Sequence, residues 1–301
     1  MCRPVKRLPP SMSDIDTTTL NPPHSAWPGE PGGVYADPPA SARRRQAPAV
    51  EIVIPVYNEE HVLRASVSRL REYLRRQLPV SYAITIADNA STDGTLALAR
   101  ELARELPEVG VLHLDRKGRG QALRAAWSAS DAEVVAYMDV DLSTDLDALP
   151  ALLGPLLAGR GDVAIGSRLA PGAEVRRSVK RELISRAYNT LLRVMLRVGF
   201  SDAQCGFKAI RGDVVKPLLD EVFDEEWFFD TELLYRAQRG RLAIHEVPVR
   251  WVEDRDSRVA ILATAWADWR GIMRLRREAD RPLAPGALPA GAGSVPRLSH
   301  G

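Results

Sequence analysis

The feature that most constrains the fold is an alternation of apolar strand-like segments with amphipathic helical segments, without hairpin turn signals between them. One helical segment has apolar residues every three or four positions, at Leu63, Val67, Leu70 and Leu74. This order predicts parallel strands joined by helical crossovers. We therefore expect an α/β fold with a mostly parallel sheet and helices on both faces. The expected strands are 50–56, 83–87, 109–114, 134–138 and 162–166.

The composition is that of a globular protein. Of the 301 residues, 45% are apolar and 27% are charged, and the net charge of +2 gives no indication of nucleic-acid binding. The two cysteines provide no disulfide framework and suit a reducing compartment. The longest mostly apolar run, near 260–267, is far shorter than the roughly 18–20 residues that span a bilayer. No signal-peptide pattern follows the early basic residues, so we expect a cytoplasmic protein that can touch a membrane surface.

Both ends of the chain differ in composition from its middle. Residues 1–48 are rich in Pro, Ser and Thr and show no apolar periodicity, and residues 281–301 are similar. Such segments bury too little apolar surface to offset the entropy lost on ordering. We expect two disordered tails around one folded domain at 49–280.

Two closely spaced carboxylates follow the strand expected at 134–138. Asp139 and Asp141 would lie at the carboxyl edge of the sheet, where open α/β sheets bind ligands. Neighbouring carboxylates repel each other unless a cation lies between them, and a hard divalent ion that also binds phosphate oxygens is the usual solution. The alternative is a polar, solvated turn, because Asp-x-Asp is common by chance.

Other strand ends are also polar. Tyr57, Asn58 and Glu59 follow the first expected strand, Asp88 follows the second, and the Lys-Gly-Arg-Gly segment at 117–120 follows the third. Parallel strands bring these residues to one edge. Glycines and backbone N–H groups at a helix start can bind an anion, although 117–120 could also be a flexible basic turn. The convergence favours a binding site for a metal and a diphosphate.

Seven segments form an ordered set of motifs: Ile54–Glu60, Asp88–Thr95, Gly118–Gly120, Asp139–Asp141, Gly166–Arg168, Asp202–Lys208 and Trp227–Leu233. Together they resemble family 2 glycosyltransferases of the GT-A fold. Within these, the last two segments look most like the dolichyl-phosphate β-glucosyltransferases, and the dolichyl-phosphate mannose synthases are similar. The resemblance covers about residues 50–275. It implies a GT-A domain with additional amphipathic helices at the membrane interface.

The resemblance implies a nucleotide-sugar site, with Asp88 near the base or the ribose. Its residues would be Pro55, Tyr57, Glu59, Asp88, Gly118, Gly120, Asp139 and Val140. Asp139 and Asp141 would hold Mg²⁺ or Mn²⁺. Ser143 occupies the position at which the mannose synthases have a glutamine metal ligand, so Ser143 itself, a water or Asp145 would complete the coordination. Arg168, Arg181 and Ser185 would bind the lipid phosphate, and Asp141, Arg168 and Asp230 would be catalytic.

The implied reaction is inverting transfer of a hexose to polyprenyl or dolichyl phosphate. Glucose from UDP-glucose is favoured, and mannose from GDP-mannose is the alternative. A phosphate acceptor is already anionic, so the site needs cations to stabilise the leaving group rather than a strong base. Two other functions stay open. One is a soluble family 2 enzyme that uses Asp230 as the base for a hydroxyl acceptor, and the other is a non-catalytic nucleotide-sugar binding protein.

Two basic amphipathic segments are candidates for membrane contact. In 175–198 an apolar stripe lies beside several arginines, and in 258–277 two tryptophans lie near an arginine cluster. Either segment could lie at a membrane surface, or it could pack on the domain with a solvated basic face. The resemblance favours the membrane surface for the first segment and leaves the second open. Cys205 and His113 show no ligand spacing, so we expect structural roles for them.

Overall fold

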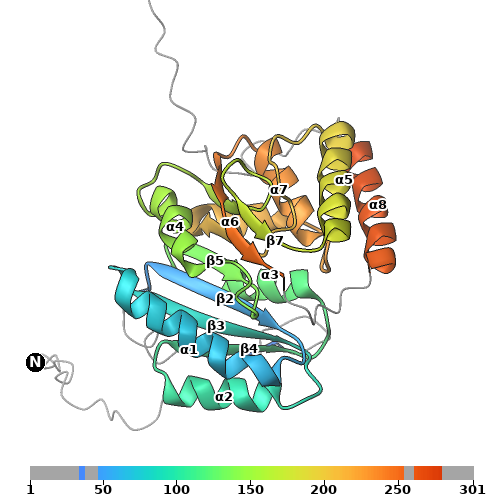
Figure 1. Ribbon diagram of the computed structural model, residues 1–301. Coiled ribbons are helices and arrows are strands. Elements are labelled where there is room, and N and C mark those ends of the chain that lie inside the picture. The colour runs from blue at the N-terminus through green and yellow to red at the C-terminus, as the bar shows by residue number, and fades with distance from the viewer. Residues whose placement is uncertain (1–33, 38–46, 254–260, 280–301) are drawn as a thin grey trace, which may run out of the picture.

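The computed structural model describes residues 34–37, 47–253 and 261–279, which form a twisted eight-stranded sheet with helices on both faces (Figure 1). The strand order is β1-β4-β3-β2-β5-β8-β6-β9. All neighbouring strands pair in parallel except where β1 meets β4 and where β8 lies between β5 and β6. The expected mostly parallel α/β sheet is confirmed.

The strands of this sheet are β1 (Val34–Asp37), β2 (Val50–Val56), β3 (Tyr82–Asn89), β4 (Val109–Leu114), β5 (Val134–Met138), β6 (Val163–Ser167), β8 (Phe207–Arg211) and β9 (Ile244–Pro248). A short separate pair joins β7 (Glu174–Arg176) to β10 (Arg250–Val252) in parallel. The central strands are buried on both faces, which explains their continuous apolar runs.

Two layers of helices cover the sheet. The first layer packs on one face and contains α1 (Glu60–Gln77), α2 (Thr95–Glu105) and α4 (Leu149–Leu157), the last after the short 3₁₀ turn η1 (Leu146–Ala148). The second layer packs on the opposite face and contains α3 (Arg119–Ala129), α6 (Gly212–Asp220) and α7 (Phe229–Arg239). Outside this layer, α5 (Val179–Leu196) and α8 (Ile261–Glu278) lie side by side (Figure 1).

The strand directions bring the polar loops to one edge. β2, β3, β4, β5 and β6 all end there, and the antiparallel β8 begins there. Phe207 at the start of β8 pairs with Met138 at the end of β5, so Gly206 lies beside Asp139. This arrangement is the reason that residues from 57 to 206 can share one site.

Part of the expected N-terminal tail is ordered. Val34–Asp37 forms β1, which pairs antiparallel with β4. The reason is that β4 would otherwise be an open sheet edge with unpaired backbone groups, and a strand that covers it satisfies them. The remainder of the expected tail up to residue 46, and the expected tail at 281–301, lie outside the described residues.

Gly120 allows α3 to approach the start of α7 closely. A Cβ at this position would lie 2.6 Å from the Cβ of Phe229 and 2.8 Å from the backbone carbon of Glu225. We expect Gly120→Ala to lower the free energy of unfolding by about 1–3 kcal/mol, because the added methyl group forces backbone to move. Denaturant unfolding measures this change.

Gly154→Ala in α4 is the matched control, because no atom lies within 4 Å of a Cβ there. We expect this substitution to leave stability unchanged or to raise it by up to about 1 kcal/mol, since alanine favours helix. Equal effects at the two glycines would contradict the close packing of α3 on α7.

Candidate active site

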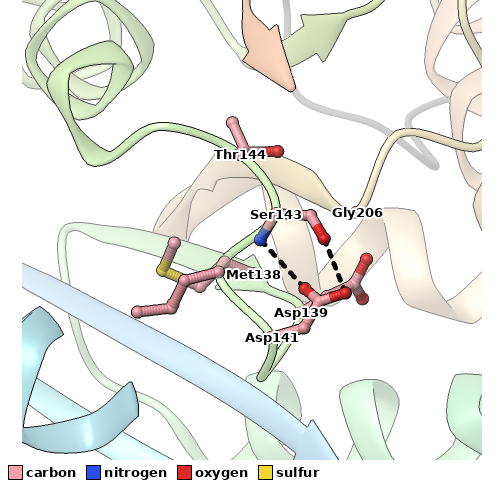
Figure 2. A pocket seen from close by; sticks show the side chains of 7 residues that line it. Met138, Asp139, Asp141, Ser143, Thr144 and Gly206 are labelled. Carbon is pink, nitrogen blue, oxygen red and sulfur yellow. Dashed lines mark hydrogen bonds between the residues drawn. The ribbon is translucent and has the colours of Figure 1, made fainter. Parts of the chain in front are cut away.

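The two strand-end carboxylates line one small hollow at the carboxyl edge of the sheet (Figure 2). Asp139 directly follows β5, and the Asp141 carboxylate accepts hydrogen bonds from Ser143, at 3.0 Å from its backbone nitrogen and at 2.6 Å from its hydroxyl. The remaining walls are Met138, Leu142, Thr144 and Gly206. The structure therefore brings Asp139, Asp141 and Ser143 together, and their binding of a metal ion stays a prediction.

Gly206 makes room for the Asp139 carboxylate. A Cβ on Gly206 would lie 1.8 Å from Oδ2 of Asp139, and the backbone N–H of Asp139 donates to the Gly206 carbonyl at 3.2 Å. A side chain at position 206 would force the Asp139 carboxylate to move. The glycine in the sequence Gln-Cys-Gly-Phe-Lys thus allows the observed position of this carboxylate.

The donor set of the hollow fits a hard divalent cation. Two carboxylates and a serine hydroxyl are oxygen ligands of the kind that Mg²⁺ and Mn²⁺ accept. The described residues contain no group of three or more His, Cys, Asp or Glu side chains placed to hold a metal ion. An ion held here by Asp139 and Asp141 would need further oxygen ligands, and phosphate oxygens of a substrate are the usual source.

A second group of polar side chains surrounds Asp88, at the end of β3. Asp88 is fully buried, and its Oδ2 lies 2.6 Å from Nδ1 of His113 on β4. Its Oδ1 has no hydrogen-bond partner among the described residues. A buried acceptor without a partner is costly, so this oxygen is suited to a donor group of a ligand.

Hydrogen bonds connect the turn after β2 to the turn that follows Asp88. Asn58 has a φ of 56° and exchanges hydrogen bonds with Thr92, which joins the turn before α1 to the turn before α2. The ammonium group of Lys117 lies 3.7 Å from the ring centroid of Tyr57. Asparagine tolerates the left-handed conformation that this tight turn needs. Tyr57 and Lys117 therefore form one wall near the strand end.

The other residues expected to bind the nucleotide sugar lie around the same edge. Pro55 is in β2, the Glu59 backbone N–H donates to the Thr95 hydroxyl at 2.9 Å, and Val140 is 8% exposed. Gly118 donates its N–H to Oδ1 of Asn89 at 2.7 Å, which fixes the start of α3 against the end of β3. Their contact with a nucleotide sugar stays a prediction.

Arg168 is fixed at the end of β6 by Asp202. The Asp202 carboxylate accepts from Nε and Nη2 of Arg168 at 2.7 and 2.9 Å and from its backbone N–H at 3.1 Å. Although burial opposes the charged form, Asp202 raises the pKa of Arg168, and Arg168 in turn lowers the pKa of the buried Asp202. The guanidinium also lies 5.5 Å from the Trp251 ring centroid. Arg168 is thus a permanently charged group of fixed position.

Asp230 has a different environment from that of a general base. Its Oδ1 lies 2.8 Å from the Lys208 ammonium and 2.5 Å from the Tyr137 hydroxyl, and its Oδ2 lies 2.5 Å from Nη1 of Arg119. Burial would raise the pKa of Asp230, but Lys208 and Arg119 outweigh it and lower that pKa. A carboxylate that is buried, paired and acidic is a poor proton acceptor. This geometry favours a positioning role for Asp230 over the catalytic role that we expected.

Arg181 and Ser185 lie one turn apart on α5, as expected. Arg181 pairs with Glu253, with 2.7 Å between Nη1 and Oε1, and the other oxygen of Glu253 accepts the Ser178 N–H at 2.8 Å. The Ser185 hydroxyl is buried and has no hydrogen-bond partner within the described ranges. A carboxylate thus occupies the anion-binding start of α5, next to Arg181.

Apolar side chains are exposed on α5 and α8. Val179, Leu183 and Val194 of α5 are 69–85% exposed, whereas the helix packs inward through Asn189, Leu192 and Leu196. On α8, Trp266 and Trp269 are 66% and 40% exposed. Val179, Leu183 and Val194 of the expected stripe are therefore exposed, whereas Leu191 and Val198 of the same stripe pack with the core. Contact of either helix with a membrane stays a prediction.

In the part of the chain that the structure describes, no helix is long and apolar enough to cross a membrane.

Several residues of the site were not identified from the sequence. Arg119, Tyr137 and Lys208 form the buried network around Asp230, and His113 orients Asp88. A charged residue inside the apolar strand Phe-Lys-Ala-Ile was a usable signal for Lys208, because a buried lysine needs a partner. No comparable signal existed for His113, since the pairing of β3 with β4 decides its contact.

This fold, with two carboxylates at the carboxyl edge of its sheet, defines the GT-A class of glycosyltransferases. The sequence model of the family described as "Glycosyl transferase family 2" matches residues 51–219. The chain therefore belongs to glycosyl transferase family 2, and the enzyme class expected from the motifs is confirmed.

Three curated relatives illustrate the similarity. Polyprenol monophosphomannose synthase of Mycolicibacterium smegmatis is 35% identical over 233 residues, which are 75% of this chain and 85% of that protein. Human dolichyl-phosphate beta-glucosyltransferase is 30% identical over 224 residues, 70% of this chain and 69% of that protein. Glycosyltransferase AglD of Haloferax volcanii is 38% identical over 215 residues, 71% of this chain, and the match spans about a third (34%) of AglD.

Solved structures show the same fold. Glucosyl-3-phosphoglycerate synthase from Mycobacterium tuberculosis, in complex with Mn²⁺, uridine diphosphate and glucosyl-3-phosphoglycerate, superposes with a TM-score of 0.55. The identity is 21%, and the match covers 79% of this chain and 82% of that one. At this identity the likeness shows the fold alone, and it confirms the expected GT-A architecture.

Asp268 joins α8 to the edge of the site, and it predicts a pH effect on stability. Its Oδ2 accepts from Nε2 of Gln204 at 3.3 Å, and its Oδ1 is buried and has no hydrogen-bond partner in the part of the chain that the structure describes. Burial, with Asp224 adding to it, raises the pKa of Asp268 from 3.8 to about 6. Because the folded-state pKa is the higher one, the stability contributed by the protonated acid is present below pH 3.8 and is lost as the pH rises through about 6.

Asp268→Asn should therefore raise the free energy of unfolding by about 1–3 kcal/mol at pH 8 and leave it unchanged near pH 4, because asparagine resembles the neutral acid. Denaturant unfolding at both pH values measures the difference. Asp131→Asn, at a carboxylate whose side chain is 82% exposed, is the control and should change stability by less than about 0.5 kcal/mol at either pH. A gain of equal size at pH 4 would contradict the assignment.

Proposed function

We propose that this protein transfers a hexose from a nucleotide sugar to a polyprenyl phosphate, with inversion at the anomeric carbon and with the help of a divalent ion. The observation that carries the proposal is the combination of two features. Arg119 pairs with Asp139 of the carboxylate hollow, and α8, which contacts Gln204 through Asp268, presents exposed apolar residues together with α5. The names of the relatives, which are polyprenol-phosphate and dolichyl-phosphate sugar transferases, support the same reaction.

Each group of the site has a role in this reaction. Asp139 and Asp141 would hold Mg²⁺ or Mn²⁺, which when bound neutralises charge on the departing diphosphate. The free oxygen of Asp88 would accept a hydrogen bond from the nucleotide, next to Tyr57 and Lys117. Arg168 is fixed by Asp202 and would bind phosphate oxygens near the reacting carbon.

The acceptor needs positioning rather than deprotonation. A polyprenyl phosphate is an anion at neutral pH, so its oxygen attacks the anomeric carbon without a base. Arg181 would bind this phosphate, and the phosphate would replace the Glu253 carboxylate at Arg181 and at the start of α5. The paired state of Asp230 supports this reaction over transfer to a hydroxyl group, which would need a free carboxylate as base.

The identity of the sugar is the finer part of the proposal. The motif resemblance favours UDP-glucose, and three relatives named as dolichyl-phosphate beta-glucosyltransferases agree with it at 25–30% identity. The polyprenol and undecaprenyl relatives named for mannose are 35% and 34% identical, so GDP-mannose is the alternative donor. Both donors belong in the assay.

The test is transfer of radiolabel from UDP-glucose or GDP-mannose into an organic-extractable product. We expect label in the organic phase only when polyprenyl phosphate is present, and loss of transfer in EDTA.

Asp141→Asn should lower kcat on the order of 100-fold, because a charged ligand near the leaving diphosphate is lost. Asp147→Asn on the same loop, with its side chain 68% exposed, should retain full activity. Transfer in the absence of the lipid phosphate, or a fully active Asp141→Asn enzyme, would contradict the proposal.

The apolar surface of α5 and α8 predicts binding to vesicles that contain anionic lipids. Leu183→Glu should weaken binding about tenfold, because it exchanges an apolar side chain for a charge in the layer that contacts lipid. Sedimentation with vesicles measures the change. Ala97→Glu, which adds the same charge to the exposed side of α2 on the other face of the sheet, should bind like the wild-type protein. Equal losses in the two variants would indicate a general charge effect instead.

A further inference from the structure

Arg119 connects the buried part of the site to the hollow at its surface. Its Nη1 lies 2.5 Å from Oδ2 of Asp230, and its Nη2 lies 3.0 Å from Oδ1 of Asp139. The side chain is 12% exposed, and its guanidinium lies 5.0 Å and 5.3 Å from the ring centroids of Tyr137 and Trp227. This guanidinium therefore has a fixed place directly behind the Asp139 carboxylate.

Two acidic and two basic side chains form this series of contacts, and Asp141 adds a further carboxylate in the hollow. Asp139 and Asp230 contribute two negative charges, and Arg119 and Lys208 contribute two positive charges. Lys208 is fully buried and binds the Asp230 oxygen that Arg119 leaves free. If Arg119 moved away, the buried Asp230 carboxylate would lose part of its charge compensation, which is costly. The contact of Arg119 with Asp230 therefore also fixes the ion pair between Arg119 and Asp139.

The Asp139 carboxylate lies between Arg119 and Gly206, and its side chain is 47% exposed. Its Oδ1 accepts the Arg119 hydrogen bond, and its Oδ2 lies against Gly206 so closely that a Cβ there would meet it at 1.8 Å. A divalent ion that binds Asp139 must accept a guanidinium as a near neighbour. The repulsion weakens binding of a free ion, and the negative charge of a bound diphosphate offsets that repulsion.

We propose that Arg119 is a positioning residue that keeps Asp139 paired and makes binding of the divalent ion depend on the nucleotide diphosphate. The inference rests on the proposed use of a metal and a nucleotide sugar. It assigns to Arg119 a task that the reaction alone does not require: free Mg²⁺ or Mn²⁺ binds poorly, and the ion binds well only together with the diphosphate that supplies its remaining oxygen ligands.

The test is the binding of Mn²⁺, followed by the electron paramagnetic resonance signal of the free ion, with and without UDP or GDP. The wild-type protein should bind free Mn²⁺ weakly and should bind it at least about tenfold more tightly with a nucleotide diphosphate. Arg119→Gln should bind free Mn²⁺ about tenfold more tightly than the wild-type protein, because the repelling charge is gone.

Arg116→Gln is the matched control. It removes the same charge from the same loop, but Arg116 is 61% exposed and faces Glu225, at 3.5 Å, rather than Asp139. We expect its affinity for free Mn²⁺ to equal that of the wild-type protein within about twofold. An equal gain in both variants, or no gain in Arg119→Gln, would overturn the proposal.

A second variant keeps the proposal testable if Arg119→Gln does not fold. Arg119→Gln/Asp230→Asn removes the arginine together with the buried carboxylate that it compensates. This double variant should bind free Mn²⁺ about tenfold more tightly than Asp230→Asn alone, because the repelling charge is gone. An affinity equal to that of Asp230→Asn alone would contradict the role of Arg119. Absence of Mn²⁺ binding by the wild-type protein with either nucleotide would instead contradict the proposed metal-assisted reaction.

Discussion

The ion pair between Asp139, at the end of β5, and Arg119 is the interaction on which the rest of the site depends. Asp139 lies in front of Arg119, and Arg119 is held by Asp230, which is held in turn by Lys208. Each charge has a partner, so the strand can end in acidic groups without an uncompensated charge in the protein interior. The arrangement places a chain of four charges between the core and the substrate side.

The fold could be predicted from the sequence because local patterns specify it. Buried strands such as Val134–Met138 are short apolar runs, and the amphipathic stripe from Leu63 to Leu74 matches the buried face of α1. The strands β1 and β8 were not predicted from such local patterns. Their pairing with β4, and with β5 and β6, is set by sheet edges and by chain reversal, which a local pattern does not contain.

The residues at the strand ends could be predicted from the sequence, whereas the buried contacts of Asp230 could not. Asp139, Asp141 and Asp88 follow strands, and parallel topology alone brings them to one edge. Asp230 was expected to face a substrate, but α7 presents it to Lys208 and Arg119 instead. Which side chains surround Asp230 depends on the packing of α7 against α3 and β5, whose contacting residues are 111 and 93 positions away along the chain.

In the proposed reaction, one short segment would link the side that binds the acceptor to the side that binds the donor. The Val252 N–H donates to the Ser143 carbonyl at 3.0 Å, next to the carboxylate hollow, and Glu253, the next residue, binds Arg181 and the start of α5. A phosphate that displaces Glu253 from Arg181 would therefore act on a segment hydrogen-bonded to the loop of Asp141. Since an anion at α5 and a diphosphate at the hollow both change the charge that this segment experiences, binding of the two substrates should be coupled through it rather than independent.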